Sequence, residues 1–198
     1  MPSKPSSDVK NRIFETTKSL VKSRGHVTIK DIAEACYINI AAVNYHFGSK
    51  DELMSRVMDS VIDELKTLVQ DHIATLPKNT PPEQALRIML DITYDFAVEN
   101  VGIITQIFLE PRHKDESGVM VLDAFFSDTP FTRNIIQKLA ESTGIRDEET
   151  LRAKYLLLFS SFAIPLFLQI LDNSDDHAGL KNPSFKEKYI NELIKILV

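Results

Sequence analysis

The sequence predicts an all-α fold of about nine helices. Apolar residues recur at helical spacing over most of the 198-residue chain, and no stretch shows the strict alternation of a half-buried strand. Residues that favour helix ends, above all Ser, Thr, Asn, Gly and Pro, separate these apolar runs. Two domains are expected, a small one over residues 1–48 and a larger one over residues 49–198.

The first three helices are expected to be closely spaced. The apolar stripe of the first ends before Gly25, because glycine readily takes the left-handed conformation that follows a helix. Thr28 then stands as the N-cap of a second helix, and Asn39 as the N-cap of a third, from Ile40 to His46. The stripe of the first helix consists of Val9, Ile13, Phe14, Thr17, Leu20 and Val21.

The fourth helix is expected to be long and to connect the two domains. A capping box begins at Ser49, and apolar residues follow at helical steps to Thr75, a length of about 26 residues or roughly 40 Å. The proline-containing segment 76–82 ends this helix. Pro130 interrupts a later segment, and residues 173–183 are expected to form an exposed polar loop.

The apolar segment from Tyr155 to Leu171 raises the question of a membrane. It is shorter than the roughly 20 residues that a span needs, and Pro165 lies in its middle, so a buried helix is expected and a transmembrane helix is the alternative. Residues 1–8 lack the apolar core of a secretory signal, which favours a cytoplasmic location.

The charge of the chain is unevenly distributed. Residues 1–50 carry eight basic and four acidic side chains, a net charge of +4 within a chain whose total is −5. A basic N-terminal segment on an acidic body predicts a partner that is a polyanion. Chance clustering of solvated charges is the alternative.

Catalytic and metal-binding signatures are missing from the sequence. The single cysteine, Cys36, excludes a disulfide scaffold and a cysteine metal cluster, and the five histidines lack metal-ligand spacing. No nucleophile-elbow, P-loop, dinucleotide or zinc-protease motif occurs. The Asp-rich segment 172–176 lacks the glycine and glutamate that a calcium loop requires. We therefore expect no enzyme, no metal and no cofactor.

Residues 28–53 carry the most informative pattern, two short helices joined by a tight turn at residues 36–39. Ala33 is small where the two helices must cross, and Val43 and Phe47 supply apolar contacts toward the first helix. This is the layout of a helix-turn-helix, whose second helix enters the major groove of DNA.

The motif resembles the tetracycline-repressor (TetR) family of bacterial one-component regulators. The matching residues are Thr28, Ile32, Ala33, His46, Phe47, Lys50 and Leu53, with conservative changes at Ile38 and Val43. Tyr37 stands where the family usually has glycine, Cys36 replaces alanine, and Asn39 replaces serine. Asn44 stands where a phosphate-contacting tyrosine is common, which leaves open whether Asn44 or Tyr45 contacts the DNA backbone.

The resemblance and the residue chemistry together predict a DNA-binding surface. Lys50 offers its charge and a helix N-terminus to a phosphate, and Asn44 has the chemistry to read adenine. Small alanines suit thymine methyl groups. The predicted DNA-binding residues are Thr28, Asn39, Ile40, Ala41, Ala42, Asn44, Tyr45, His46 and Lys50. A basic arm of Lys4, Lys10 and Arg12 is a further candidate. The alternatives are a packed His46, an Asn44 that only caps or faces solvent, and a solvated arm.

The resemblance also implies that the C-terminal domain dimerises and binds a small molecule. The predicted dimer residues are Phe167, Phe185, Tyr189, Leu193 and Leu197, and the alternative is a monomeric core. The predicted effector-pocket residues are Met89, Thr93, Phe96, Gln106, Phe108, Glu110, Met120, Asp123, Phe126, Phe159 and Phe162, and the alternative is ordinary core packing. Asp91, Asp95 and Glu99 are expected on a solvent face.

The sequence thus predicts a homodimeric regulator that binds double-stranded operator DNA with a pseudo-palindromic sequence. A repressor released by a small-molecule effector is the favoured reading. An architectural or division-control DNA-binding protein of the same fold, without a small ligand, is the main alternative, and a helical enzyme is the remaining one.

Overall fold

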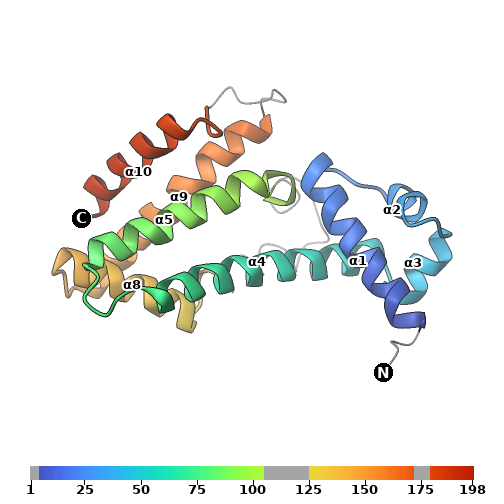
Figure 1. Ribbon diagram of the computed structural model, residues 1–198, viewed down its shortest axis with the longest axis horizontal. Coiled ribbons are helices and arrows are strands. Elements are labelled where there is room, and N and C mark those ends of the chain that lie inside the picture. The colour runs from blue at the N-terminus through green and yellow to red at the C-terminus, as the bar shows by residue number, and fades with distance from the viewer. Residues whose placement is uncertain (1–4, 105–124, 172–178) are drawn as a thin grey trace. The chain divides into compact units, whose positions relative to one another are not determined.

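The computed structural model describes residues 5–104, 125–171 and 179–198, and within these ranges all regular secondary structure is helical (Figure 1). The helices are α1 (Pro5–Arg24), α2 (Ile29–Ala35), α3 (Ile40–Phe47), α4 (Lys50–Thr75), α5 (Pro82–Glu99), α8 (Pro130–Thr143), α9 (Glu148–Leu171) and α10 (Pro183–Leu197). The all-α prediction is confirmed for this part of the chain. The predicted end of the first helix, the start of the second after Thr28, and the bounds of the third and fourth agree with these to within a residue.

The chain forms two compact units. The first includes residues up to Ile62 and returns at Asn100, and the second includes Asp63–Glu99 and the residues from Val121 onward. α4 is one continuous helix that belongs to both, since the division falls within it. The expected domain boundary after residue 48 stays a prediction.

The first unit is held together by an apolar core between α1, α2, α3 and the first half of α4. The stripe predicted for α1 does face this core, where Thr17 is also buried and donates its hydroxyl to the carbonyl of Ile13 at 2.7 Å. The buried apolar side chains from α1 to α4 in this unit are Ile13, Val21, Val27, Ile32, Ala33, Cys36, Val43, Phe47, Leu53, Met54, Val57, Met58, Val61 and Ile62.

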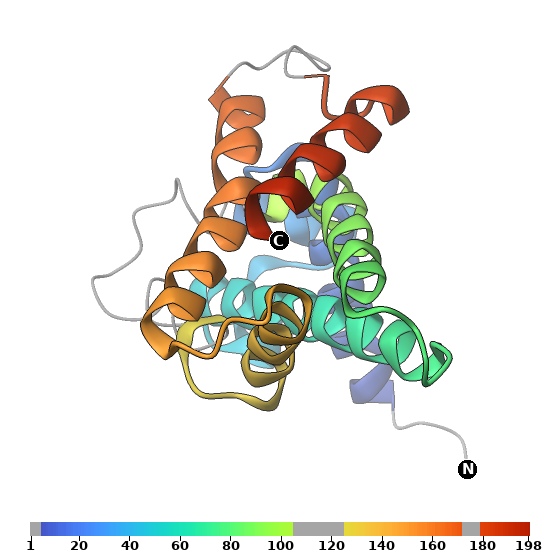
Figure 2. The same cartoon turned by 90° about the vertical axis from the view of Figure 1, so that its left-hand side faces the viewer.

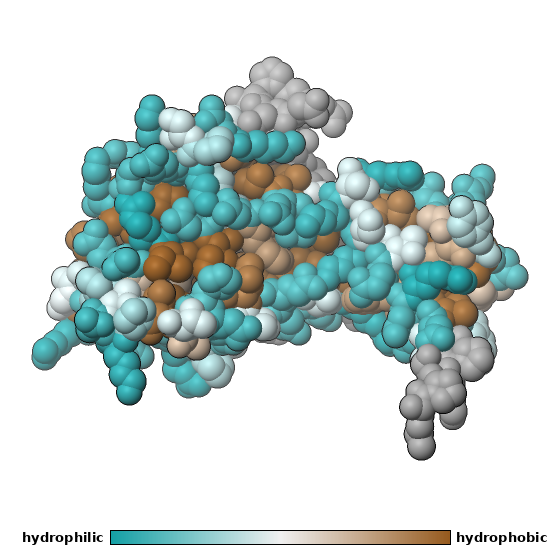
Figure 3. Space-filling view, in the orientation of Figure 1, coloured by the Kyte–Doolittle hydropathy of each residue, from teal (hydrophilic) through white to brown (hydrophobic). Residues whose placement is uncertain are grey.

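In the second unit, α5 packs against α8, α9 and α10, and α10 also contacts α9 (Figure 2). Helix ends are again set locally: Thr129 caps α8, whose first residue is Pro130, and Gly144 ends it in the left-handed conformation. Pro165 lies inside α9. Apolar atoms reach the visible surface of this unit between polar side chains (Figure 3). No helix in the described ranges is long and apolar enough to cross a membrane.

Asp95 and Glu99 are exposed, as expected for the acidic face of α5, and Lys186 of α10 pairs with two of its three acids. The Nζ of Lys186 lies 3.1 Å from an Asp91 carboxylate oxygen and 2.8 Å from one of Asp95, so two of the three acids form an ion-pair cluster between helices. Burial lowers the pKa of Lys186, but its hydrogen bonds to Asp95 and Asp91 outweigh that effect and leave the pKa raised. The cluster joins α5 to α10.

An aromatic cluster lies between residues 125–126, α8 and α9. Phe126 packs edge-on against Phe159 and Tyr155, with ring centroids 4.7 Å and 5.9 Å away. Phe125 contacts Phe131 and Phe159. Buried Tyr155 donates its hydroxyl to the carbonyl of Phe125 at 2.5 Å, which satisfies its polar end inside the cluster.

Candidate nucleic-acid interface

The start of α2 is fixed by a capping box around Thr28. The Thr28 hydroxyl accepts a hydrogen bond from the Asp31 backbone N–H at 3.1 Å, and the Asp31 carboxylate accepts one from the Thr28 N–H at 2.8 Å. The Thr28 hydroxyl also donates to the carboxylate. The hydrogen bond from the Thr28 side chain is the main cause that lowers the pKa of Asp31, and the bond from the Thr28 backbone N–H lowers it further. The sequence signal for this helix start is confirmed.

The start of α3 depends on Asn39. Its side-chain oxygen accepts a hydrogen bond from the Ala42 N–H at 2.7 Å, so the N-cap prediction is confirmed. α3 ends at Gly48, which takes φ +82° and whose N–H donates to the carbonyl of Asn44 at 2.7 Å. α4 begins two residues later, where the Ser49 hydroxyl accepts the Glu52 N–H at 3.1 Å.

The turn between α2 and α3 places a tyrosine where the backbone favours glycine. Tyr37 has φ +54°, the only positive value at a non-glycine position within the described ranges. The Ile38 N–H donates to the Ala33 carbonyl at 3.0 Å and the Tyr37 N–H to that of Glu34 at 3.1 Å. These two bonds are a Schellman motif, which ends α2 and makes Tyr37 its left-handed residue.

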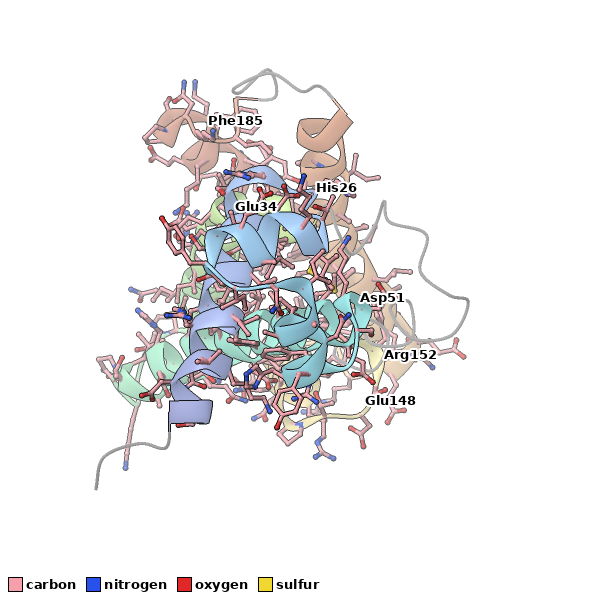
Figure 4. The ribbon with its side chains drawn as sticks, turned by 90° about the vertical axis from the view of Figure 1, so that its right-hand side faces the viewer. His26, Glu34, Asp51, Glu148, Arg152 and Phe185 are labelled. Carbon is pink, nitrogen blue, oxygen red and sulfur yellow. The ribbon has the colours of Figure 1, made fainter. Side chains whose placement is uncertain are left out.

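α3 has one buried face and one exposed face. Val43 and Phe47, one turn apart, are buried in the core of the first unit. On the opposite side Tyr45 is 83% exposed, and Ile40, the first residue of the helix, is 42% exposed. Asn44 is exposed as well. Figure 4 looks onto α2 and α3, with Glu34 labelled on the outer side of α2. A helix held by one face and bare on the other is available for a groove of DNA.

Two basic side chains lie over the ring of Phe47. Lys10 Nζ of α1 is 5.6 Å from the ring centroid and Arg56 Cζ of α4 is 5.7 Å from it, both within cation–π range. Lys50, the first residue of α4, lies three residues beyond Phe47 and is half-buried. Lys10 and Lys50 are among the residues predicted from the sequence, whereas Arg56 is not, because the helix-turn-helix motif gives no signal at its position.

The remaining predicted DNA-binding residues are exposed or half-buried. Ala41 is exposed, and Ala42 and His46 are half-buried. The His46 ring meets the Tyr45 ring edge-on at 5.2 Å between centroids. Thr28 and Asn39 are exposed, although their side-chain oxygens are already occupied by the caps. Their contact with DNA stays a prediction.

The predicted effector residues that the structure describes lie in the second unit. Met89 is buried, Thr93 donates to the Met89 carbonyl, and Phe96, Phe159 and Phe162 are half-buried. Phe126 is 38% exposed. Gln106, Phe108, Glu110, Met120 and Asp123 lie outside the described residues, as does Lys4 of the arm.

Described residues of this unit line a small hollow and a larger one. The smaller includes Phe162 and holds about 10 Å³, room for about one water molecule. The larger holds about 390 Å³, within the size range of small-molecule sites. Its lining residues are Phe126, Thr132, Ile136, Glu149, Arg152, Ala153, Tyr155 and Leu156. No group of three His, Cys, Asp or Glu in the described ranges is placed to hold a metal ion.

The predicted dimer residues have different environments. Leu193 and Leu197 are buried within the chain itself, and Tyr189 is half-buried with its hydroxyl donating to the Ser161 carbonyl. Phe185 is 38% exposed. Phe167 lies in α9, in a part whose side chains are not described. Leu156, Leu157 and Ile164 of α9 and Ile196 of α10 are exposed apolar residues outside the predicted dimer set.

Comparison with known proteins agrees with this geometry. Residues 13–57 match the family model described as "Bacterial regulatory proteins, tetR family", a segment that runs from α1 into α4 and includes the whole of α2 and α3. The HTH-type transcriptional regulator BetI of Agrobacterium fabrum is 24% identical over 95 residues, 46% of this chain and 45% of that protein. The alignment thus spans less than half of that curated relative.

Solved structures extend the similarity of fold to nearly the whole chain. A transcriptional regulator from Rhodococcus sp. Rha1 superposes with a TM-score of 0.71 at 15% identity and covers 95% of both chains. Thermus thermophilus FadR, a TetR-family transcriptional repressor in complex with lauroyl-CoA, gives 0.61 at 16% identity, covering 95% of this chain and 92% of its own. Residues 13–57 thus match the tetR family model over the helix-turn-helix, and the fold of nearly the whole chain is similar to that of these solved regulators.

Proposed function

We propose that the chain is a homodimeric, sequence-specific DNA-binding repressor that a small-molecule effector releases from a pseudo-palindromic operator. The observation that carries the proposal is the exposed face of α3. A buried Val43 and Phe47 hold the helix in place, while Asn44 and Tyr45 face outward with no core to cover them. Asn44 has the donor and acceptor pair that reads adenine in the major groove.

The charge of the first unit supports a phosphate-rich partner. Lys10, Lys50 and Arg56 come from three places in the sequence, and the first and last approach the same Phe47 ring. Each phosphate that such a side chain neutralises releases counterions, so binding gains affinity at low salt. The rest of the chain carries a net negative charge, which repels the phosphates of DNA. The proposed interface is therefore limited to the N-terminal helices.

Dimerisation is proposed through the outer faces of α9 and α10. Leu157 and Ile164 are 52% and 60% exposed and lie seven residues, about two helical turns, apart on α9. Ile196 of α10 is 62% exposed. Large apolar side chains in contact with water favour burial against a second copy, and a two-fold axis would then present two α3 helices to two half-sites. In this arrangement Leu193 and Leu197 hold α10 in place.

The effector is proposed to bind in the second unit. The 390 Å³ pocket combines aromatic and aliphatic walls with the charged side chains of Glu149 and Arg152, which suits an amphipathic small molecule. The lauroyl-CoA complex of Thermus thermophilus FadR supports a ligand-responsive body on this fold. Effector binding would release the DNA only if the DNA-binding and the released conformations of the repressor differ in effector affinity. α4 would connect the two sites, because it is the helix common to both units.

The test is a selection of genomic DNA fragments with the purified protein. We expect a small set of related, pseudo-palindromic fragments, each bound by a dimer or by a pair of dimers. Genes beside those fragments suggest candidate effectors, which are then added to the protein–DNA complex to measure release. Many dispersed sites with no change in expression would favour the architectural alternative, and an effector that tightens the complex would contradict the induction model.

The dimer is tested separately by sedimentation of Leu157→Glu. A charge in an apolar interface costs several kcal/mol, so the variant is expected to sediment as a monomer at micromolar concentration. Leu68→Glu is the matched control, because Leu68 is an exposed leucine, 37% exposed, on α4 and not on either helix of the proposed interface. A wild-type protein that is already monomeric would contradict the dimer.

A further inference from the structure

Tyr37 occupies a backbone conformation that its own side chain disfavours. At φ +54° the Cβ of an L-residue crowds the backbone, which is why glycine usually ends a Schellman motif. Every other positive φ in the described ranges belongs to glycine, at Gly25, Gly48, Gly144 and Gly179. Tyr37 is therefore the one position in these ranges where the fold tolerates a left-handed residue with a large side chain.

The fold gains little from the ring of Tyr37. The side chain is 95% exposed, so it buries almost no apolar surface. The two hydrogen bonds that close the turn come from the backbone N–H groups of Tyr37 and Ile38, and glycine at position 37 would make the same bonds. A strained residue that does not stabilise the fold indicates a role outside it.

The position of Tyr37 points to that role. It lies two residues before Asn39, the N-cap of α3, and the N-terminal end of the second helix is the end that a helix-turn-helix directs at base edges. Tyr37, Asn39 and Ile40 are all exposed. A long side chain with a hydroxyl at its tip, at the entrance to the recognition helix, is placed to reach a backbone phosphate beside the groove.

We propose that Tyr37 is a DNA-contacting residue whose phenol hydroxyl donates a hydrogen bond to a backbone phosphate next to α3, and that its strained conformation is retained for this contact. The proposal rests on the proposed DNA-binding function. Replacing Tyr37 by glycine should then raise stability and weaken binding, which replacing a purely structural residue would not do.

The experiment compares the full-length wild type with Tyr37→Gly, Tyr37→Asn and Tyr37→Phe. Thermal unfolding and binding to two duplexes are measured, one from the genomic selection and one of unrelated sequence. Tyr37→Gly is expected to raise Tm by about 2–4 °C, because it relieves the left-handed strain. Its affinity for both duplexes should fall about tenfold, because a hydrogen bond to a charged oxygen is lost.

The other two variants separate the causes. Tyr37→Asn has a side chain that tolerates the left-handed conformation. If it loses as much affinity as Tyr37→Gly, the added backbone flexibility of glycine is not the cause of the loss. Tyr37→Phe keeps the ring and its strain, and should lose the same affinity at an unchanged Tm. The dependence on salt should stay the same in all variants, because a phenol carries no charge.

Several outcomes would overturn the inference. Tyr37→Gly binding as tightly as wild type, or unfolding at a lower Tm, would show that the side chain serves the fold or nothing. If Tyr37→Phe bound DNA with full affinity, the hydroxyl would not be part of the contact. If affinity fell for only one of the two duplexes, the side chain would contact a base and not a phosphate. A wild type that binds neither duplex would instead refute the proposed function.

Discussion

Gly102 lies so close to the end of α1 that a Cβ on it would stand 2.4 Å from the carbonyl oxygen of Val21. The same Cβ would stand 2.7 Å from the carbonyl oxygen of Lys22. Both are backbone atoms of a helix, so neither moves aside as a flexible side chain would. The segment that rejoins the first unit at Asn100 can therefore pack this closely against α1 only because residue 102 has no side chain.

Gly102→Ala should destabilise the protein by about 1–3 kcal/mol, the usual effect of an added methyl group in a tightly packed place. Urea unfolding followed by circular dichroism measures the change. Gly144→Ala is the matched control, because Gly144 has φ +71° and open space around its Cβ position. Its destabilisation of about 1–2 kcal/mol should come from the backbone alone. Hydrogen exchange should then increase in α1 for the first variant only, and unchanged exchange there would contradict the close contact.

Lys50→Ala should weaken DNA binding and make it less sensitive to salt. Lys50 begins α4, where its charge and the helix N-terminus favour a phosphate. Loss of one phosphate contact should reduce the slope of log affinity against log salt by about one unit. Lys188→Ala removes the same charge from the exposed surface of α10 and should leave the slope unchanged. Equal slopes for wild type and Lys50→Ala would exclude the contact.

Asn39→Ala should destabilise the first unit by about 1 kcal/mol, because the Ala42 N–H loses the side chain that caps it. Asn39→Ser keeps a capping oxygen and should restore most of the stability. The two variants separate capping from DNA contact. If Asn39 also contacts DNA, Asn39→Ser will fold as well as wild type and still bind the selected duplex more weakly. Full binding by Asn39→Ser would limit the residue to its cap.

The free energy of unfolding should fall at alkaline pH because of Tyr155. Burial raises its pKa to about 12, against a smaller lowering by its hydrogen bond with Thr132, whereas an exposed tyrosine titrates near pH 10. The folded state thus keeps the proton that the unfolded chain releases. The stabilisation is complete below about pH 10 and is lost as pH rises through about 12, to the extent of about 2 kcal/mol.

Urea unfolding between pH 9 and 11.5 measures this loss, and Tyr155→Phe should flatten the curve. Its stability at neutral pH should fall by about 1 kcal/mol, because the hydrogen bond to the Phe125 carbonyl is gone. Burial also raises the pKa of Tyr189, so Tyr189→Phe is the control that leaves the Tyr155 contribution in place. An unchanged alkaline limb in Tyr155→Phe would contradict the assignment.

The helix ends were predictable because their causes are local. A cap depends on a residue and the next three, so Thr28 and Asn39 can be recognised in the sequence, and the structure confirms both. The inner and outer faces of α3 follow from helical periodicity for the same reason, with Val43 and Phe47 inside and Asn44 and Tyr45 outside.

Contacts between distant residues were not predictable from spacing. Asp95 and Lys186 are 91 residues apart, and the pattern of acids on α5 carries no sign of the lysine that pairs with them. The close approach of Gly102 to Val21 likewise leaves no local signal. The larger pocket shares only Phe126 with the predicted effector residues, because the position of a hollow depends on how helices cross.

Cys36, the chain's one cysteine, can report on local opening of the helix-turn-helix. It is 1% exposed at the end of α2, beside the Tyr37 turn, so a thiol reagent reaches it only when that turn opens. The rate of labelling therefore measures the local stability of the helix-turn-helix, separately from that of the second unit and without an added probe. A bound duplex that holds the two helices together should slow the labelling of Cys36. The labelling rate would then also report the fraction of the protein that is bound to DNA.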